Sequence, residues 1–382
     1  MALPEPSPDA SASSSRLLDH IAKEIERAGG WLPFDRYMAL ALYTPGLGYY
    51  SGGARKFGAA GDFVTAPELS PLFAQCLAAQ VTQIMAASAP RLLEAGAGSG
   101  ILAAELLAEL ERLGALPERY DILELSGELR ARQQETIRAR VPHLAPRVAW
   151  LDALPDSFSG ALVANELLDA LPVRLVAWRE DGVFERGVRR DDNGGFAWEE
   201  RPATGALLAV SQGLTFVRPP YVSEIALAAR AWVAEWGRIL QKGALLLIDY
   251  GFPQREVYHP QRAEGTLMCH YRHHAHGDPF WLPGLNDLTA HVDFTAMAEA
   301  GHEAGLDVLG YTSQAQFLLN CGLAPLLEAQ QADGARYAAL ASGAQKLISP
   351  AEMGELFKVL ALGKGIDEAL LGFARGDRMH SL

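Results

Sequence analysis

Residues 91–102, which read RLLEAGAGSGIL, constrain the fold more than any other stretch of this 382-residue chain. An apolar run ends at Glu94, and a helical pattern begins at Ile101. The turn between them holds three glycines at alternate positions, Gly96, Gly98 and Gly100. A strand that leads through a glycine turn into a helix brings backbone N–H groups close to a nucleotide-like ligand. A tight turn in an α/β domain that binds no ligand would give the same pattern.

The spacing of the glycines indicates which ligand such a turn would take. The dinucleotide fingerprint requires a third small residue where this chain has Ile101, which disfavours nicotinamide-dependent oxidoreduction. The acidic Glu94 directly ahead of the turn suits a ligand with a cationic amino-acid end and no pyrophosphate. S-adenosyl-L-methionine, which leaves S-adenosyl-L-homocysteine as product, is such a ligand.

Composition excludes several classes of protein. The formal net charge of -13 argues against sequence-independent nucleic-acid binding, which requires a positive field. Three well-separated cysteines indicate a reducing compartment, and no apolar run is long enough to be inserted in a membrane. Residues 1–15 lack Arg, Lys and an apolar core, so they resemble neither a signal nor a transit peptide. We therefore expect a disordered tail over 1–15 on a cytoplasmic, bacterial protein.

Apolar strands alternate with helical patterns beyond residue 89. We predict strands at 91–94, 120–125, 148–151, 160–164 and 244–248, with helices at 101–113 and 127–140 between the first of them. Fully apolar strands that alternate with helices are typical of an α/β fold with a doubly wound, mostly parallel, Rossmann-like sheet.

Other segments flank or interrupt this repeat. Residues 16–88 are predicted to form a helical N-terminal or lid region, and 312–382 a helical C-terminal cap. The core would occupy 89–311. Within it, the segment of about 173–220 alternates apolar with charged residues around two turn signals, which predicts an inserted antiparallel β segment.

Acidic side chains follow several of the predicted strands. Glu94 ends the first strand, Glu124 ends the second at the distance where an acid usually binds ribose hydroxyls, and Asp152 follows the third and could accept from an adenine amine. Asp249 follows the last of these strands. One such acid alone is better explained as a helix cap or a solvated strand end. Their recurrence predicts a cofactor site, which we extend to Leu125 beside Glu124.

The segment Asn165-Glu166-Leu167-Leu168-Asp169 follows the fourth strand. Carboxylates three residues apart project from one face of a helix or tight turn. The pair Glu166 and Asp169 could orient a planar guanidinium beside a methyl donor. The same two side chains could instead cap a helix or solvate its first turn.

Histidines gather in the segment 270–276. They lack both the Cys-x-x-Cys pattern and a regular ligand spacing, so we expect no metal site. Hydrogen-bonded loop histidines, one or two of them facing an acceptor pocket, are the preferred interpretation.

Several stretches together resemble the MidA family of class I S-adenosylmethionine-dependent methyltransferases, whose mitochondrial member methylates protein arginine. The matching stretches span nearly the whole chain: 43–50, 61–68, the glycine turn, 165–172, 246–251, 265–267, 287–294, 314–318 and 353–358. The resemblance implies that Glu94, Gly96, Gly98 and Glu124 contact the cofactor. It also implies a lid over the methionine end that includes Gly61, Asp62 and Thr65. Asn165, Glu166 and Asp169 would then lie where acceptor and donor meet.

The sequence thus predicts a methyltransferase that acts on an arginine side chain of a protein. Methylation of a small molecule or of another side chain remains an alternative, as does a non-catalytic assembly factor that binds the cofactor for stability. The identity of the acceptor and the choice between monomer and homodimer stay open.

Overall fold

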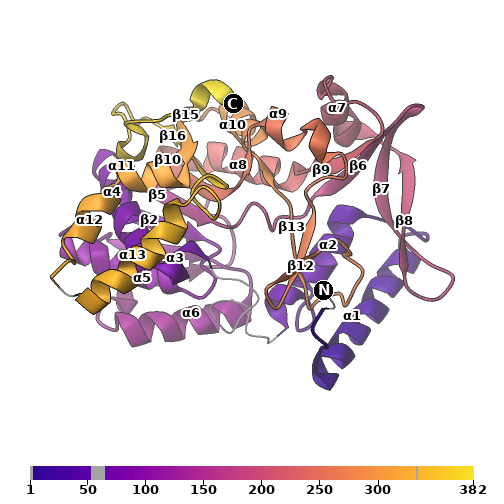
Figure 1. The fold of residues 1–382 in the computed structure, drawn as a ribbon, viewed down its shortest axis with the longest axis horizontal. Coiled ribbons are helices and arrows are strands. Elements are labelled where there is room, and N and C mark those ends of the chain that lie inside the picture. The colour runs from indigo at the N-terminus through magenta and orange to yellow at the C-terminus, as the bar shows by residue number, and fades with distance from the viewer. Residues whose placement is uncertain (1–2, 53–64, 333) are drawn as a thin grey trace. The chain divides into compact units, whose positions relative to one another are not determined.

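The computed structural model describes residues 3–52, 65–332 and 334–382. The chain divides into two compact units (Figure 1). Unit 1 combines Met1–Phe63, Asp169–Ala231 and Gln254–Asp293, and unit 2 combines Val64–Leu168, Trp232–Pro253 and Phe294–Leu382. This division differs from the predicted one, because the chain leaves unit 2 and returns to it twice after residue 168.

Unit 2 is built on a large sheet with the strand order β15-β16-β10-β5-β2-β3-β4. Its strands are β2 (Arg91–Ala95), β3 (Arg119–Leu123), β4 (Val148–Leu151), β5 (Phe158–Asn165), β10 (Leu240–Phe252), β15 (Asp307–Ser313) and β16 (Phe357–Lys364). Neighbours from β10 to β4 pair in parallel, whereas β16 pairs antiparallel with β10 and β15. The chain order reverses between β2 and β5, so a ligand crevice is expected at the carboxyl ends of these two strands. The predicted doubly wound, mostly parallel sheet is confirmed.

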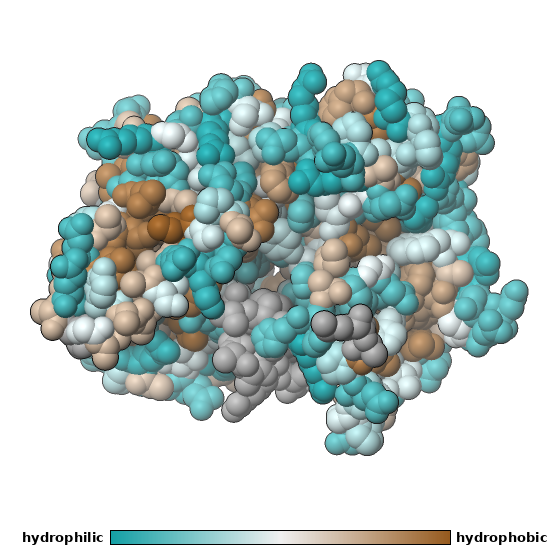
Figure 2. All heavy atoms as spheres, in the orientation of Figure 1, coloured by the Kyte–Doolittle hydropathy of each residue, from teal (hydrophilic) through white to brown (hydrophobic). Residues whose placement is uncertain are grey.

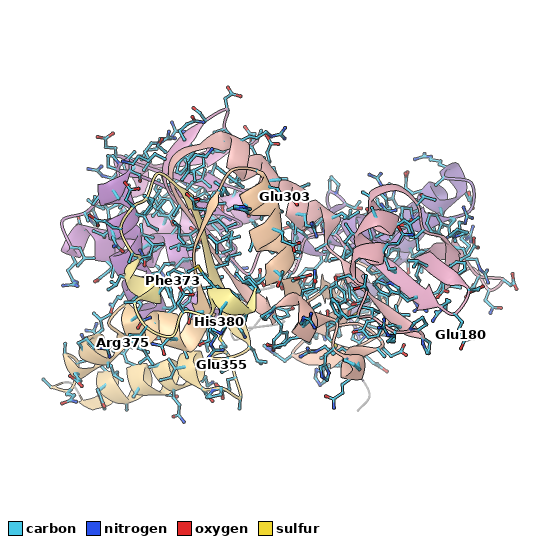
Figure 3. The ribbon with its side chains drawn as sticks, turned by 90° about the horizontal axis from the view of Figure 1, so that it is seen from above. Glu180, Glu303, Glu355, Phe373, Arg375 and His380 are labelled. Carbon is cyan, nitrogen blue, oxygen red and sulfur yellow. The ribbon has the colours of Figure 1, made fainter. Side chains whose placement is uncertain are left out.

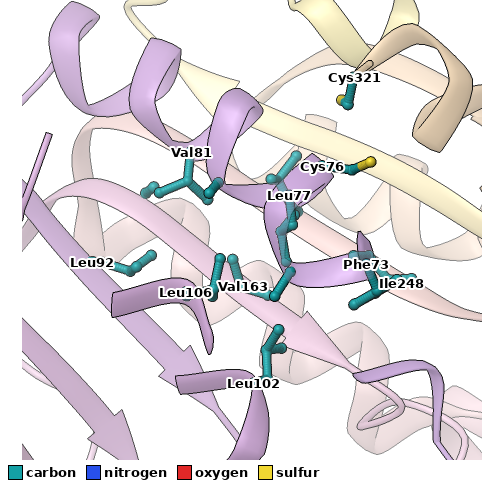
Figure 4. Packing of buried hydrophobic residues seen from close by; sticks show 14 of the residues in the cluster. Phe73, Cys76, Leu77, Val81, Leu92, Leu102, Leu106, Val163, Ile248 and Cys321 are labelled. Atoms are coloured by element: carbon teal, nitrogen blue, oxygen red, sulfur yellow. The ribbon is translucent and has the colours of Figure 1, made fainter. Parts of the chain in front are cut away.

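Apolar packing on both faces holds this sheet. Helices α4 (Pro71–Ala87) and α5 (Ile101–Arg112) lie over one face, where Leu77, Leu106 and Val163 pack in a buried cluster (Figure 4). On β10, Leu245 and Leu246 point to opposite faces and both are fully buried. The central stretch of β10, residues 244–248, is apolar at every position because it is covered on both sides.

The remaining elements of unit 2 are helical. They are α3 (Ala66–Leu69), α6 (Gly127–Arg140), α10 (Phe294–Glu303), α11 (Gln314–Asn320), α12 (Leu323–Glu328) and α13 (Gly334–Ile348), and α8 (Leu227–Ile239) spans the boundary between the units.

Unit 1 contains an antiparallel sheet of order β1-β7-β6-β9, with β8 paired to β7. The strands are β1 (Leu32–Pro33), β6 (Arg174–Arg179), β7 (Gly182–Arg190), β8 (Phe196–Pro202) and β9 (Tyr221–Ile225). The predicted antiparallel segment is therefore present, and its two turn signals, Asp181-Gly182 and Asn193-Gly194-Gly195, lie at the β6–β7 and β7–β8 connections. Helices α1 (Pro8–Arg27) and α2 (Phe34–Tyr43) share an apolar cluster with this sheet. The other elements of unit 1 are α7 (Gly205–Gly213), α9 (Gln254–Val257), β11 (Met268–Tyr271), β12 (His274–His276), β13 (Asp287–Thr289) and β14 (Val292–Asp293).

The two chain ends differ from their predictions. Residues 8–15 are helical, so the prediction of a disordered tail is wrong there: Ser7 caps α1 and Pro8 occupies its first position, a pair that favours a helix start. The region 312–382 is not a purely helical cap, because β16 completes the central sheet with Val359 and Leu360 fully buried. Figure 3 shows Phe373 and Arg375 in the C-terminal segment, where Phe373 packs edge-on against Phe317.

Hydrophilic side chains dominate the molecular face shown in Figure 2, with hydrophobic residues in separate groups. Among the described residues, no helix is long and apolar enough to cross a membrane.

Candidate active site

The glycine turn of unit 2 adopts a backbone that favours glycine at three positions. Gly96, Gly98 and Gly100 have φ angles of 71°, 49° and 79°. A Cβ atom at Gly96 would lie 2.9 Å from Leu167 Cδ1, and one at Gly100 would lie 2.9 Å from Gln133 Cα. The turn opens at the carboxyl end of β2 and leads directly into α5. The sequence pattern therefore forms the expected cradle at a helix N-terminus.

Glu94 lies at the end of β2 and is almost completely buried. Its Oε2 accepts a hydrogen bond of 2.6 Å from the Tyr120 hydroxyl. Burial raises the pKa of Glu94 to about 7, the Tyr120 hydrogen bond opposes this shift, and the charge of Glu124 adds to it. A cationic group bound nearby would stabilise the ionised form of this carboxylate.

Glu124 is tied to the glycine turn by Gln133 of α6. Gln133 Nε2 lies 3.0 Å from Glu124 Oε2 and 3.2 Å from the Gly98 carbonyl oxygen, and it donates to both. Trp150 Nε1 donates to Gln133 Oε1 at 2.9 Å, which fixes the amide orientation. Burial raises the pKa of Glu124, although hydrogen bonds from the Ser126 N–H and Gln133 oppose the shift. This network holds a carboxylate beside the cradle.

Asp152 and Leu125 lie at the same edge of the sheet but are exposed. Asp152 Oδ1 pairs with Arg130 Nη1 at 2.7 Å, and Arg130 Nε also donates to the Glu124 carbonyl oxygen at 2.6 Å. Leu125 is 80% exposed, so its side chain is free of the core.

The segment after β5 forms a sharp bend and no helix. Glu166 has a φ of 52°, a left-handed conformation that is rare outside glycine, and no helix begins within residues 166–169, so of the helix or tight turn predicted for Glu166 and Asp169 only the turn is present. Glu166 Oε1 accepts from the Ala66 N–H at 3.3 Å and from Asn165 Nδ2 at 3.1 Å. Asn165 Oδ1 is buried and has no hydrogen-bond partner among the residues that the structure describes.

Most of the predicted site residues lie in unit 2. They are at or just after the carboxyl ends of strands β2 to β5: Glu94, Gly96, Gly98, Gly100, Glu124, Asp152, Asn165 and Glu166. Thr65 precedes α3, whose first N–H group belongs to Ala66 and donates to Glu166. Gly61 and Asp62 lie outside the described residues.

Asp169 belongs to unit 1, where it is nearly buried and its carbonyl oxygen accepts from the Ala290 N–H at 3.1 Å. The same unit holds a second buried carboxylate, Asp287, which accepts a hydrogen bond of 2.9 Å from the Tyr50 hydroxyl. The ring of Tyr43 stacks on that of Tyr50 with centroids 5.5 Å apart. Burial, followed by the charges of Asp287, Tyr43 and Asp169, raises the pKa of Tyr50 well above its usual value.

The histidine-rich segment forms a hairpin of β11 and β12. His276 Nε2 lies 2.9 Å from Asn286 Oδ1, and His274 Nδ1 lies 2.7 Å from the Arg272 carbonyl oxygen. Within the described ranges, no group of three or more potential ligands is arranged to hold a metal ion.

The residues present fit S-adenosyl-L-methionine. Any residue larger than glycine at positions 96 or 100 would collide with Leu167 or Gln133, so the backbone of the turn can come as close to its surroundings as a nucleotide-binding glycine turn requires. Glu94 lies at the end of β2 directly ahead of the turn, Glu124 is linked to the Gly98 carbonyl oxygen through Gln133, and both carboxylates are nearly buried. Three supporting residues were missed from the sequence: Gln133, Tyr120 and Arg130. Their contacts depend on the parallel pairing of β2, β3 and β4 and carry no local sequence signal.

Comparisons with known proteins agree with this geometry. A family model described as "Putative S-adenosyl-L-methionine-dependent methyltransferase" matches residues 72–312. Among curated relatives, the protein named "Protein arginine methyltransferase NDUFAF7, mitochondrial" from Danio rerio is 30% identical over 92% of this chain and 88% of its own length. The corresponding Caenorhabditis elegans homologue is 25% identical over 78% of this chain and 74% of its own length.

Two crystal structures of Burkholderia thailandensis proteins are similar over the full length of both chains. One, which holds S-adenosyl-homocysteine, has a TM-score of 0.96 and 56% sequence identity. The other, a native structure, has a TM-score of 0.94 and 55% identity. The bound product in the first of them matches the cofactor that the glycine turn predicted.

Proposed function

This chain belongs to the family of S-adenosyl-L-methionine-dependent methyltransferases, and we propose that its methyl acceptor is an arginine side chain of a protein. The observation that carries the proposal is the position of Glu166. Its carboxylate follows β5 at the point where the strand order reverses, next to the strand that leads into the glycine turn. The curated relatives named as protein arginine methyltransferases support the same acceptor.

Each part of the site has a role in this proposal. The backbone of Gly96–Gly100 would hold the methionine and ribose parts of the cofactor, Glu94 its ammonium group and Glu124 its ribose hydroxyls. Leu125 and Asp152 would lie at the adenine, and Gly61, Asp62 and Thr65 would cover the methionine end. When bound, the cofactor supplies an electrophilic methyl group on sulfur.

Glu166 can act on the acceptor. A carboxylate binds the planar guanidinium through paired hydrogen bonds and fixes which nitrogen faces the donor. As the new N–C bond forms and the C–S bond breaks, that nitrogen loses a proton, which Glu166 can accept. Asn165, whose Oδ1 has no partner among the described residues, can accept from a second guanidinium N–H. Asp169 remains a predicted second carboxylate, to be tested by its own variant.

The proposal also covers the cellular compartment of the protein and the subgroup of the family to which it belongs. Cys76, Cys269 and Cys321 are free and buried, which fits a reducing compartment such as the bacterial cytoplasm. The MidA family is the subgroup in which we place the chain.

A labelling experiment separates the candidate acceptors. The enzyme is incubated with S-adenosyl-L-methionine that carries a labelled methyl group and with a lysate of the native host lacking its gene. We expect the label in the protein fraction, and a Glu166→Gln enzyme that binds cofactor normally should transfer far less. Label in the small-molecule fraction would instead favour a small-molecule methyltransferase. Absence of transfer by an enzyme that binds cofactor would favour the non-catalytic assembly factor.

A further inference from the structure

Asp249 ends the apolar core of β10 and is buried, yet no role in the proposed transfer has been given to it. Its Oδ2 accepts two hydrogen bonds from consecutive backbone N–H groups, from Leu167 at 3.1 Å and from Leu168 at 2.8 Å. Its Oδ1 accepts from the Tyr250 N–H at 2.9 Å. All of these atoms belong to unit 2.

The two leucine N–H groups directly follow the strained residue of the proposed acceptor site. Glu166 has its backbone in the left-handed region, which is unfavourable for a non-glycine residue and persists only where the surroundings enforce it. Two constraints enforce it here. The Glu166 N–H donates to the Ile248 carbonyl oxygen at 2.9 Å, and the next two N–H groups bind Asp249.

The bend after β5 also packs against the glycine turn. Leu167 Cδ1 occupies the space that a Cβ atom at Gly96 would need, so the side chain of Leu167 lies against the glycine turn. A shift of the Leu167 backbone would therefore move the Glu166 carboxylate relative to the glycine turn. Displacements of about 1 Å in such a site can lower a rate by about a hundredfold.

We propose that Asp249 is a positioning residue for methyl transfer: it clamps the Leu167 and Leu168 N–H groups and thereby fixes Glu166 relative to the glycine turn. This inference rests on the proposed function of Glu166. Asp249 would act through the backbone of Leu167 and Leu168, to which its carboxylate is bound. Its carboxylate accepts from the Leu167 and Leu168 N–H groups, which no helix among the described residues after β5 engages.

The test compares two substitutions of similar size. Asp249→Asn keeps an oxygen that can accept from Leu167 and Leu168, whereas Asp249→Leu removes it. With a lysate of the native host lacking the gene as acceptor and saturating labelled cofactor, we expect Asp249→Leu to lower the transfer rate by about tenfold or more. The transfer rate of Asp249→Asn should stay within about threefold of the wild-type rate. Both variants should bind S-adenosyl-L-homocysteine with an affinity within about threefold of wild type.

A wild-type rate in folded Asp249→Leu would overturn the proposal, and so would an equal loss of rate in both variants. If Asp249→Leu does not fold, residue-resolved amide hydrogen exchange on the wild-type enzyme decides: slow exchange at Leu167 and Leu168 is expected, and exchange at the rate of an open loop would refute the clamp. A wild-type enzyme that binds S-adenosyl-L-homocysteine but labels no protein would instead contradict the proposed function, while the exchange measurement would still test the clamp.

Discussion

Replacing Glu94 by Gln should stabilise the protein while weakening cofactor binding. Burial raises the pKa of Glu94 from 4.5 to about 7, so the folded state disfavours its charge. A raised pKa in the folded state gives stability that is present below pH 4.5 and is lost as the pH rises through 7. At pH 8 the charged carboxylate therefore costs about 3 kcal/mol relative to a neutral side chain. Gln can still accept the Tyr120 hydrogen bond, so this interaction is retained.

Urea unfolding followed by tryptophan fluorescence measures the stability difference. Between the two proteins, the unfolding free energy should be similar at pH 4.5 and should favour Glu94→Gln by about 3 kcal/mol at pH 8. A difference that is independent of pH would refute the assigned pKa.

Titration calorimetry measures the predicted weakening of cofactor binding. Only the ionised carboxylate attracts the ammonium group of S-adenosyl-L-homocysteine, so wild-type affinity should rise about tenfold from pH 5.5 to 7.0. The Glu94→Gln variant should bind more weakly at pH 7.0 and show little change over this range. If the variant kept wild-type affinity at pH 7.0, Glu94 would not contact the ligand.

Further substitutions test other parts of the site and the core. Gly98→Val should abolish binding of S-adenosyl-L-homocysteine in calorimetry, because Gly98 has a φ of 49° and lies in the cradle; wild-type affinity would exclude the turn as the cofactor site. Glu166→Gln should leave that affinity within about threefold and lower the transfer rate by about a hundredfold, and an unchanged rate would remove Glu166 from the acceptor site. Leu106→Ala should lower the unfolding free energy by about 2–5 kcal/mol, because Leu106 is fully buried between α5 and the sheet; a smaller loss would mean that the surrounding core collapses into the cavity.

The parts of the molecule that follow from local pattern were predictable from the sequence. The glycine turn, the parallel strands and the antiparallel insertion each have a periodicity or a turn signal of their own. The C-terminal strand β16 was missed because its sequence, Phe357–Lys364, lies among helical patterns and is recruited to the sheet only by pairing with β10. The start of α1 was missed because a Pro- and Ser-rich stretch reads as disorder when Ser7 is not identified as a cap.

The site residues were likewise predictable only where their signal is local in the sequence. Glu94 and Glu124 could be proposed as site residues because an acid at the end of a predicted strand is a local feature. The bend at Glu166 could not, since its left-handed backbone depends on Asp249 and Ile248, more than 80 residues away in the sequence. Gln133 gave no signal either, because its two acceptors come from different βα turns.

The most direct test of the account is to identify the methylated residue. Labelled protein from the incubation with the lysate is hydrolysed, and its amino acids are separated and compared with methylated standards. The account predicts that the label is recovered as methylarginine, and that it is absent when the Glu166→Gln enzyme is used. Recovery of the label on another amino acid, or in equal amount with that variant, would contradict it.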